Sequence, residues 1–134
     1  MRPKLSVLTA FAFVGMASIT SADEMADPGQ TTFQQYCATC HGMSGDGAGP
    51  MTEMITAAVP DLTGMTARND GVFPMLQVIH IIDGRTGLRG HGGPMPVYGA
   101  IFDDEASDTG PYGGPLYTRG KILSVAYYLE SLQK

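Results

Sequence analysis

The chain carries the sequence Cys-Ala-Thr-Cys-His at residues 37–41. Two cysteines separated by two residues and followed at once by histidine form the pattern typical of covalent haem attachment. On a helix, positions i, i+3 and i+4 share one face, so Cys37, Cys40 and His41 point the same way. We therefore expect both thiols to bond to the vinyl groups of one haem c, and the imidazole of His41 to bind its iron.

Two other kinds of site use paired cysteines. A redox dithiol of the thioredoxin kind follows a strand in a βαβ unit, whereas an amphipathic helical stripe precedes Cys37. A structural zinc ion takes four Cys or His ligands, and the other histidines, His80 and His91, lie far from the pair in sequence. Haem attachment is therefore the favoured interpretation. A large apolar haem group would also form the centre of the hydrophobic core in a chain that has few core residues.

The sixth ligand of the iron is expected from a second segment, since His41 fills only one axial position. The candidates are a methionine sulfur, a second histidine or no protein ligand. Of the nine methionines, Met95 lies between two prolines in the sequence Gly-Gly-Pro-Met-Pro of residues 92–96. The proline rings fix the backbone, so this loop presents the sulfur in one orientation. We predict Met95 as the ligand, with His91 as the alternative, and expect His80 to be a surface residue.

Helical patterns surround the attachment motif. The first predicted helix covers residues 28–40. It begins after the capping residue Asp27, has proline in its first turn and repeats apolar residues on the face of the cysteines. Glycines crowd residues 42–50, which predicts a loop around the flat cofactor. Apolar residues at helical spacing predict a second helix over 71–84.

The C-terminal part of the chain is predicted to consist of a long loop followed by a helix. Residues 85–118 are rich in glycine and proline and have little periodicity, so we expect a long loop around the cofactor. From Thr118, a good capping residue, apolar residues repeat at helical spacing to the C-terminus. No segment is predicted as a strand. The fold class is therefore all-α, with long irregular loops around a single covalent haem.

Residues 1–22 have the pattern of a secretory signal peptide. Arg2 and Lys4 precede an apolar run and a small-residue site, which predicts cleavage after Ala22. The run is shorter than the ~20 residues of a spanning helix, and retention as an uncleaved anchor is the alternative. In a chain of 134 residues, the remainder, 23–134, fits one domain. We expect the mature protein in the periplasm.

The mature chain is acidic. Cleavage after Ala22 removes two of the eight Lys and Arg residues and none of the thirteen Asp and Glu residues, which leaves six against thirteen, a net charge of about −7. Nucleic-acid binding needs a basic face that neutralises phosphates, so we exclude nucleic acid as a partner. No segment after the signal is apolar enough to cross a bilayer, so no stable membrane insertion is expected.

These residues together resemble the class I cytochrome c family, in particular its small bacterial monohaem members, over about residues 29–132. Gly29 and Phe33 are similar to the family's first helix, and Tyr128-Leu129 is similar to its last. The resemblance implies a small cytochrome c fold in which these two helices cross closely at the glycine. Phe33 and Tyr128 are then packing residues.

Three loop segments carry the rest of the resemblance. Gly-Pro at residues 49–50 implies that the Pro50 carbonyl accepts a hydrogen bond from His41 and fixes its tautomer. Residues 60–63 are similar to a segment beside the haem edge. Residues 91–99 are similar to the family's methionine-ligand loop, which supports Met95.

Two features depart from the family's pattern. Many relatives carry tryptophan where Tyr98 stands, and the chain has no tryptophan, so a hydrogen bond from this position is expected to differ. Residues 101–117 form a long stretch rich in glycine and proline that contains the acidic run Asp103-Asp104-Glu105. We interpret this stretch as a solvated surface loop rather than a docking site.

The expected function is one-electron transfer rather than enzymatic catalysis. An iron held by His41 and Met95 has no open position for a substrate, and thioether sulfur favours the ferrous state. We expect a monomer whose redox partner proteins dock at the haem edge through a small contact. Two alternatives stay open: a haem subunit of a respiratory or dehydrogenase complex, and a weak peroxidase or gas-binding haem protein if Met95 leaves the iron.

Overall fold

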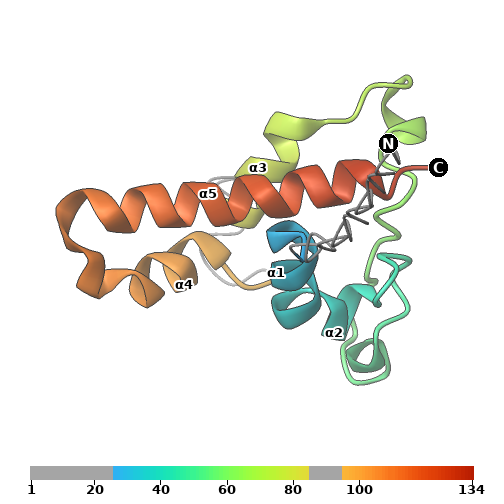
Figure 1. Ribbon diagram of the computed structural model, residues 1–134. Coiled ribbons are helices and arrows are strands. Elements are labelled where there is room, and N and C mark those ends of the chain that lie inside the picture. Colours follow the sequence, from blue (N-terminus) through green and yellow to red (C-terminus); the bar gives the residue numbers. More distant parts are fainter. Residues whose placement is uncertain (1–25, 85–94) are drawn as a thin grey trace, which may run out of the picture.

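The fold is described by a computed structural model for residues 26–84 and 95–134, so the predicted signal peptide at 1–22 lies outside the described residues. Within the described ranges every regular element is a helix and none is a strand, which confirms the predicted all-α class (Figure 1). The elements in chain order are α1 Pro28–Tyr36, α2 Ala38–His41, the short 3-10 helices η1 Pro50–Glu53 and η2 Ala67–Asn69, α3 Met75–Asp83, α4 Tyr98–Glu105, the 3-10 helix η3 Ser107–Thr109 and α5 Gly110–Ser131.

The first helix begins where the sequence predicts and is interrupted at the attachment motif. The Asp27 side chain caps α1 by accepting a hydrogen bond from the amide of Gly29 at 2.8 Å. Cys37 separates the two helices: it stays in the right-handed helical region, but its φ of −112° departs from the ideal helical value. The amides of Cys40 and His41 then both donate to the Cys37 carbonyl, at 3.1 and 2.9 Å. The single predicted helix is therefore two helices, α1 and α2.

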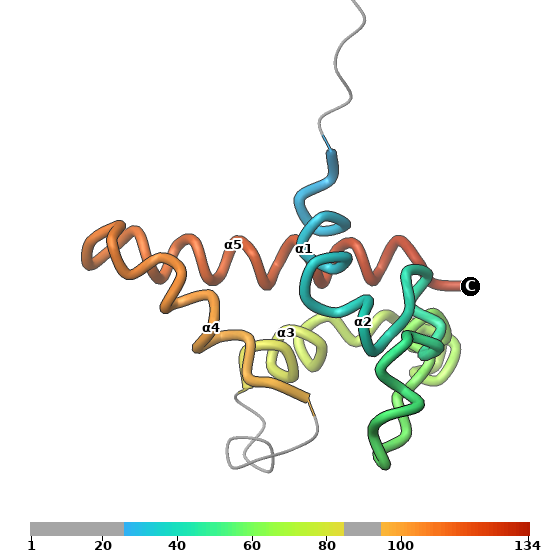
Figure 2. Tube along the Cα trace, turned by 90° about the horizontal axis from the view of Figure 1, so that it is seen from below, coloured from blue at the N-terminus to red at the C-terminus, as the bar shows by residue number. Residues whose placement is uncertain are grey.

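Helices α1 and α5 cross at close range (Figure 2). A side chain at Gly29 would overlap the carbonyl oxygen of Ser124, so glycine lets the two backbones touch there. Phe33 is fully buried, and its ring centroid lies 5.4 Å from that of Tyr128. The crossing implied by the resemblance and both packing residues are confirmed.

Replacing Gly29 with alanine is expected to destabilise the protein by about 1–3 kcal/mol, because the helices must move apart to admit a methyl group. The matched control is Gly120→Ala in α5, where nothing lies within 4 Å of the new methyl group. There we expect a gain of about 0.5–1 kcal/mol from helix propensity. Urea unfolding followed by circular dichroism measures both effects, and equal midpoints for the two variants would contradict a tight crossing.

Helix α3 packs beside α5. The helix predicted over 71–84 is observed from Met75 to Asp83, so its start lies after Pro74 and later than predicted. It ends at Gly84, whose φ of 86° is left-handed and favours glycine. Val78 and Ile82 lie one turn apart and are buried in the core.

Residues 98–117 are helical, which corrects two predictions. The sequence predicts an irregular stretch over 85–118 and a surface loop over 101–117, but α4 and η3 occupy this region and α5 begins at Gly110 rather than Thr118. Packing outweighs the low helix propensity of the segment. Phe102 and Ala106 are only 1% and 2% exposed where α4 packs against α5.

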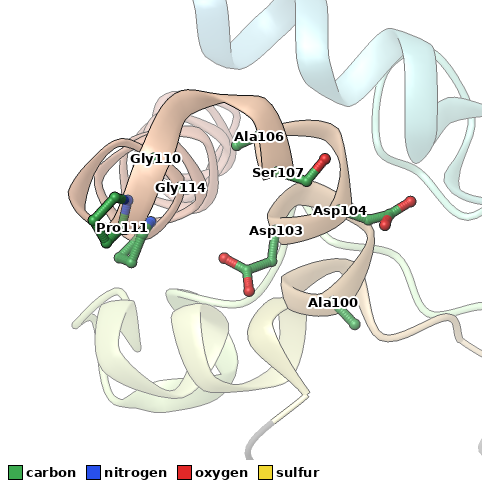
Figure 3. Close-up of a pocket in the computed structure, with 9 residues that line it drawn as sticks. Ala100, Asp103, Asp104, Ala106, Ser107, Gly110, Pro111 and Gly114 are labelled. Carbon is green, nitrogen blue, oxygen red and sulfur yellow. The ribbon is translucent and has the colours of Figure 1, made fainter.

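The corner between α4 and α5 accommodates both the prolines and the acidic residues. Pro111 lies in the first turn of α5, where a missing amide costs no helical hydrogen bond. Asp103 and Asp104 are exposed at this corner (Figure 3). The hydroxyl of Thr118 lies 3.4 Å from Oδ1 of Asp103 and links the two helices. The side chains of Asp103 and Asp104 are therefore exposed as predicted, although their backbone is helical and not a loop.

Candidate functional site

One cavity collects all the residues that the sequence predicts for cofactor binding. It has a volume of about 320 Å³, and Cys37, Cys40, His41 and Met95 all line it. The rest of the lining is mostly apolar and comes from segments far apart in the chain, with Phe33, Val59, Leu62, Val78, Ile82 and Leu129 among its members. The fold thus brings the attachment turn and the predicted methionine loop to the same space.

The attachment turn is held in place by the loop that follows it. The predicted loop over 42–50 is observed, with η1 beginning at its last residue, Pro50. The amide of Gly49 donates to the Cys40 carbonyl at 3.1 Å. A side chain at Gly49 would lie 2.5 Å from the Cys40 carbonyl oxygen. Glycine is therefore needed for the loop to fold back onto the turn.

The thiol of Cys37 lacks the lowered pKa that a redox dithiol needs. Cys37 and Cys40 are not joined by a disulfide. Burial, with a smaller contribution from Cys40, raises the pKa of the Cys37 thiol to about 12, whereas catalytic dithiols work through a lowered thiol pKa. No strand precedes the pair in the part of the chain that the structure describes. The two thiols are suited to bonding with an apolar group in the cavity rather than to disulfide exchange.

His41 ends α2 with its ring against the cavity. Its Nδ1 is buried and has no hydrogen-bond partner of normal length among the described residues. Burial lowers the His41 pKa, and the backbone of Pro60 opposes this by raising it. A neutral imidazole is therefore favoured, which is the form that binds a metal. The hydrogen bond to the Pro50 carbonyl that the resemblance implies is not present, since Nδ1 has no hydrogen-bond partner of normal length among the described residues. Pro50 begins η1, whereas Pro60 lines the cavity.

Met95 approaches the cavity from the N-terminal end of α4. It is half-buried and packs against the core. A side chain at Gly84 would overlap the side chain of Val97. A side chain at Gly99 would lie 2.5 Å from the Asp83 carbonyl oxygen. The end of α3 and the start of α4 are therefore in direct contact, and this contact restricts where Met95 lies.

Of the two histidines outside the attachment motif, the structure describes only His80. His80 is half-buried on α3 and is not among the residues that line the cavity. His91, the alternative iron ligand, lies outside the described residues. The choice between His91 and Met95 therefore stays a prediction.

Sequence reasoning missed Arg68. It is the one fully charged side chain among the described residues that line the cavity. Its Nη2 donates to the Asp61 carbonyl at 2.6 Å, which holds the guanidinium at this edge. A guanidinium binds carboxylates such as haem propionates well. No motif marks Arg68, because only the folding of the segment around η2 brings it to the cavity.

The lining fits a haem group. Two thiols and an imidazole on one turn meet in an apolar space, and a flat apolar ring that holds a metal needs both features. A larger hollow of about 580 Å³ lies between α4 and α5 (Figure 3) and is lined by small and acidic residues, Asp103, Asp104 and Ser107 among them. That hollow has no cysteine, histidine or methionine in its lining. The chemistry therefore belongs to the smaller cavity.

Comparison with known proteins agrees with this geometry. The family model described as Cytochrome c matches residues 26–133, which is most of the chain. The match includes the attachment turn, the cavity and Met95. Neither the curated proteins nor the solved structures gave a match.

Proposed function

Because the chain belongs to the cytochrome c family, we propose that it is a periplasmic electron carrier whose iron has His41 and Met95 as axial ligands. Family membership gives it a covalently bound haem c and a haem-based role in electron transfer. The axial ligands, the compartment and the partners are our proposal. The observation that supports it best is the single cavity lined by both predicted ligands and both cysteines.

Each residue of the cavity has a separate role in this proposal. When bound, haem c supplies an iron that alternates between the ferric and ferrous states. Cys37 and Cys40 fix the orientation of the group, and the neutral imidazole of His41 binds the metal. The thioether of Met95 would be the second protein ligand of the metal, which would favour the ferrous state and raise the reduction potential relative to two histidines. Arg68 supplies a positive charge for the propionates.

The apolar wall of the cavity also favours electron transfer. Val78, Ile82, Val125 and Leu129 are almost fully buried and line the space. They keep water away from the metal, and an apolar surrounding is one of the means by which a protein tunes a redox potential. We therefore expect little structural change between the two oxidation states.

Redox partner proteins are proposed to dock where the edge of the haem group reaches the surface. The whole chain has a formal net charge of −5, so a partner with a basic docking patch is favoured. The contact is expected to be small and short-lived, as redox encounters usually are.

Among the described residues, no helix has the length and apolar character needed to cross a bilayer.

The proposed function is tested on protein purified from a host that exports and matures it. We expect a pyridine haemochrome spectrum and a mass about 616 Da above that of the cleaved polypeptide. We also expect one reversible one-electron couple and, in the ferric protein, an absorption band at about 695 nm that reports methionine sulfur on the iron, here called the methionine band. An unmodified polypeptide would rule out haem attachment, and a ferric spectrum without this band would rule out methionine ligation.

The compartment is tested on the same cells. We expect osmotic shock to release the haem-stained protein with the periplasmic fraction, and its N-terminus to follow Ala22. Retention in the membrane fraction at the full polypeptide mass would show instead that the signal segment is kept as an anchor.

A further inference from the structure

We propose that one face of α4, which we call the clasp, grips Tyr36 and thereby holds Met95 on the haem iron. The clasp consists of Tyr98, Phe102 and Glu105, at helical positions i, i+4 and i+7. Tyr36 directly precedes Cys37, and Met95 lies just before the start of the clasp. The inference rests on the proposed function, because it takes Met95 as the axial ligand.

The first contact of the clasp is a hydrogen bond beside the attachment turn. The hydroxyl of Tyr98 donates to the Tyr36 carbonyl oxygen at 2.6 Å. That carbonyl lies in the last turn of α1, and the amide four residues later, that of Cys40, donates to the Cys37 carbonyl instead. Tyr98 therefore satisfies an acceptor that the interruption of the helix leaves available. Burial raises the pKa of Tyr98 to about 12, so its hydroxyl remains a donor at neutral pH.

The second contact holds the other end of Tyr36. The Tyr36 hydroxyl donates to Oε1 of Glu105 at 2.5 Å. Lys121 of α5 pairs with Oε2 of the same carboxylate at 2.5 Å, and its Nζ lies 4.6 Å from the centroid of the Tyr36 ring. Hydrogen bonds from Lys121 and Tyr36 hold the pKa of Glu105 below its usual value, so the carboxylate is charged at neutral pH. The clasp is thereby tied to α5 as well as to α1.

The third contact is the packing of the Tyr36 ring against the two aromatic members of the clasp, which also contact each other. Its centroid lies 6.1 Å from that of Tyr98 and 5.3 Å from that of Phe102. The interplanar angles of 76° and 80° are edge-to-face, a favoured arrangement of aromatic rings. Tyr36 is thus held at its carbonyl, its ring and its hydroxyl. A shift or rotation of α4 breaks at least one of these contacts.

The position of α4 determines the position of Met95. Only Pro96 and Val97 separate Met95 from α4, and the ring of Pro96 fixes the backbone at that point. The clasp therefore connects the segment that carries the cysteines and His41 to the segment that carries the methionine. Glu105 does not line the cavity, so it is a positioning residue that acts on the iron only through the placement of Met95. Tyr98 positions Met95 in the same way and also lines the cavity itself.

Loosening the clasp is expected to let Met95 leave the iron more often. An external ligand such as imidazole binds only the form without Met95, so its apparent affinity rises with the population of that form. The hydrogen bond from Tyr98 to the Tyr36 carbonyl is partly buried, and loss of one such bond corresponds to up to roughly a tenfold change in such an equilibrium. Imidazole binding is thus a readout of the clasp that does not depend on electron-transfer activity.

The experiment compares haem-loaded Tyr98→Phe with Tyr112→Phe, a matched control at a tyrosine that is 82% exposed at the start of α5. Two quantities are measured on the ferric protein: the Kd of imidazole, and the temperature at which the methionine band disappears relative to the loss of helical circular dichroism. For Tyr98→Phe we expect about tenfold tighter imidazole binding and loss of the band well before loss of the helices. For Tyr112→Phe we expect wild-type values.

A second variant tests the clasp if Tyr98→Phe cannot be obtained as folded protein with covalent haem. Glu105→Gln preserves the size of the side chain and removes the charge that pairs with Lys121. Because this end of the clasp is more exposed, a smaller effect is expected, about threefold tighter imidazole binding. Wild-type affinity in both Tyr98→Phe and Glu105→Gln would overturn the clasp. So would a parallel decrease of the band and helix-melting temperatures with unchanged imidazole binding, which indicates a structural role alone.

Met95→Ala distinguishes failure of the clasp from failure of the proposed function. If the methionine band of the wild type does not depend on Met95, the proposed ligation is wrong and the clasp is wrong with it. If the band depends on Met95 but neither band nor imidazole affinity responds to Tyr98→Phe, only the clasp is wrong.

Discussion

Replacing Met95 with alanine is expected to keep the covalent haem, abolish the methionine band, lower the reduction potential and open the iron to carbon monoxide. Alanine has no ligand atom, so the ferrous state loses the thioether that favours it. The expected decrease is on the order of 100–300 mV, a moderate part of the range of about 800 mV that axial ligands span. Redox titration measures the potential, and a carbon monoxide difference spectrum of the ferrous protein measures the open position.

The matched control for this change is Met65→Ala. Met65 lines the same cavity and packs against the core, but it is not predicted to bind the iron. We expect this variant to keep the methionine band and to lose about 1–3 kcal/mol of stability through the space left in the core. Unchanged spectra in Met95→Ala would place the ligand elsewhere, and disappearance of the band in Met65→Ala would identify Met65 as that ligand.

A second large effect is expected for Cys40→Ala. One of the two thiols is then missing, so the haem group is held by a single thioether bond at Cys37 and its orientation over the turn is less restricted. We expect a several-fold lower yield of haem-stained protein and a lower unfolding temperature, since the cofactor contributes to the core of a small domain. Intact mass, haem staining per cell and thermal unfolding measure these three consequences.

Thr39→Ala is the matched control for the cysteine change. Thr39 lies between the two cysteines and is exposed, so its replacement leaves both thiols and the imidazole in place. We expect a normal yield and a stability within about 0.5 kcal/mol of the wild type. Normal haem staining together with wild-type stability in Cys40→Ala would contradict double attachment.

The attachment turn and the first helix were accessible from sequence because their determinants are local. The cap at Asp27 and the spacing of the two cysteines and histidine act over a few residues, and helical periodicity places them on one face. The crossing at Gly29 is a long-range contact, and it was implied by resemblance to a family rather than by periodicity. The structure confirms it through the close approach of Gly29 to Ser124.

The features that the sequence did not indicate depend on contacts between distant segments. Glycine and proline in 98–117 predict a loop, but burial of Phe102 between α4 and α5 stabilises helices there. In the same way, Pro60 and not Pro50 lines the cavity with His41, because only the folded loop determines which proline returns to the cavity. The break between α1 and α2 is likewise invisible to periodicity, since both halves keep the same apolar face.

The part of the cavity wall that α5 contributes affects when the haem group can be attached to the chain. Val125 and Leu129 of α5 line the same cavity as Cys37, yet they come far after it in the chain and are therefore synthesised later. With α5 docked onto α1, both cysteines are only partly exposed, so an enzyme that delivers a cofactor has less access to their thiols than in the open chain. We therefore expect haem attachment to be faster before α5 docks onto α1 than after it.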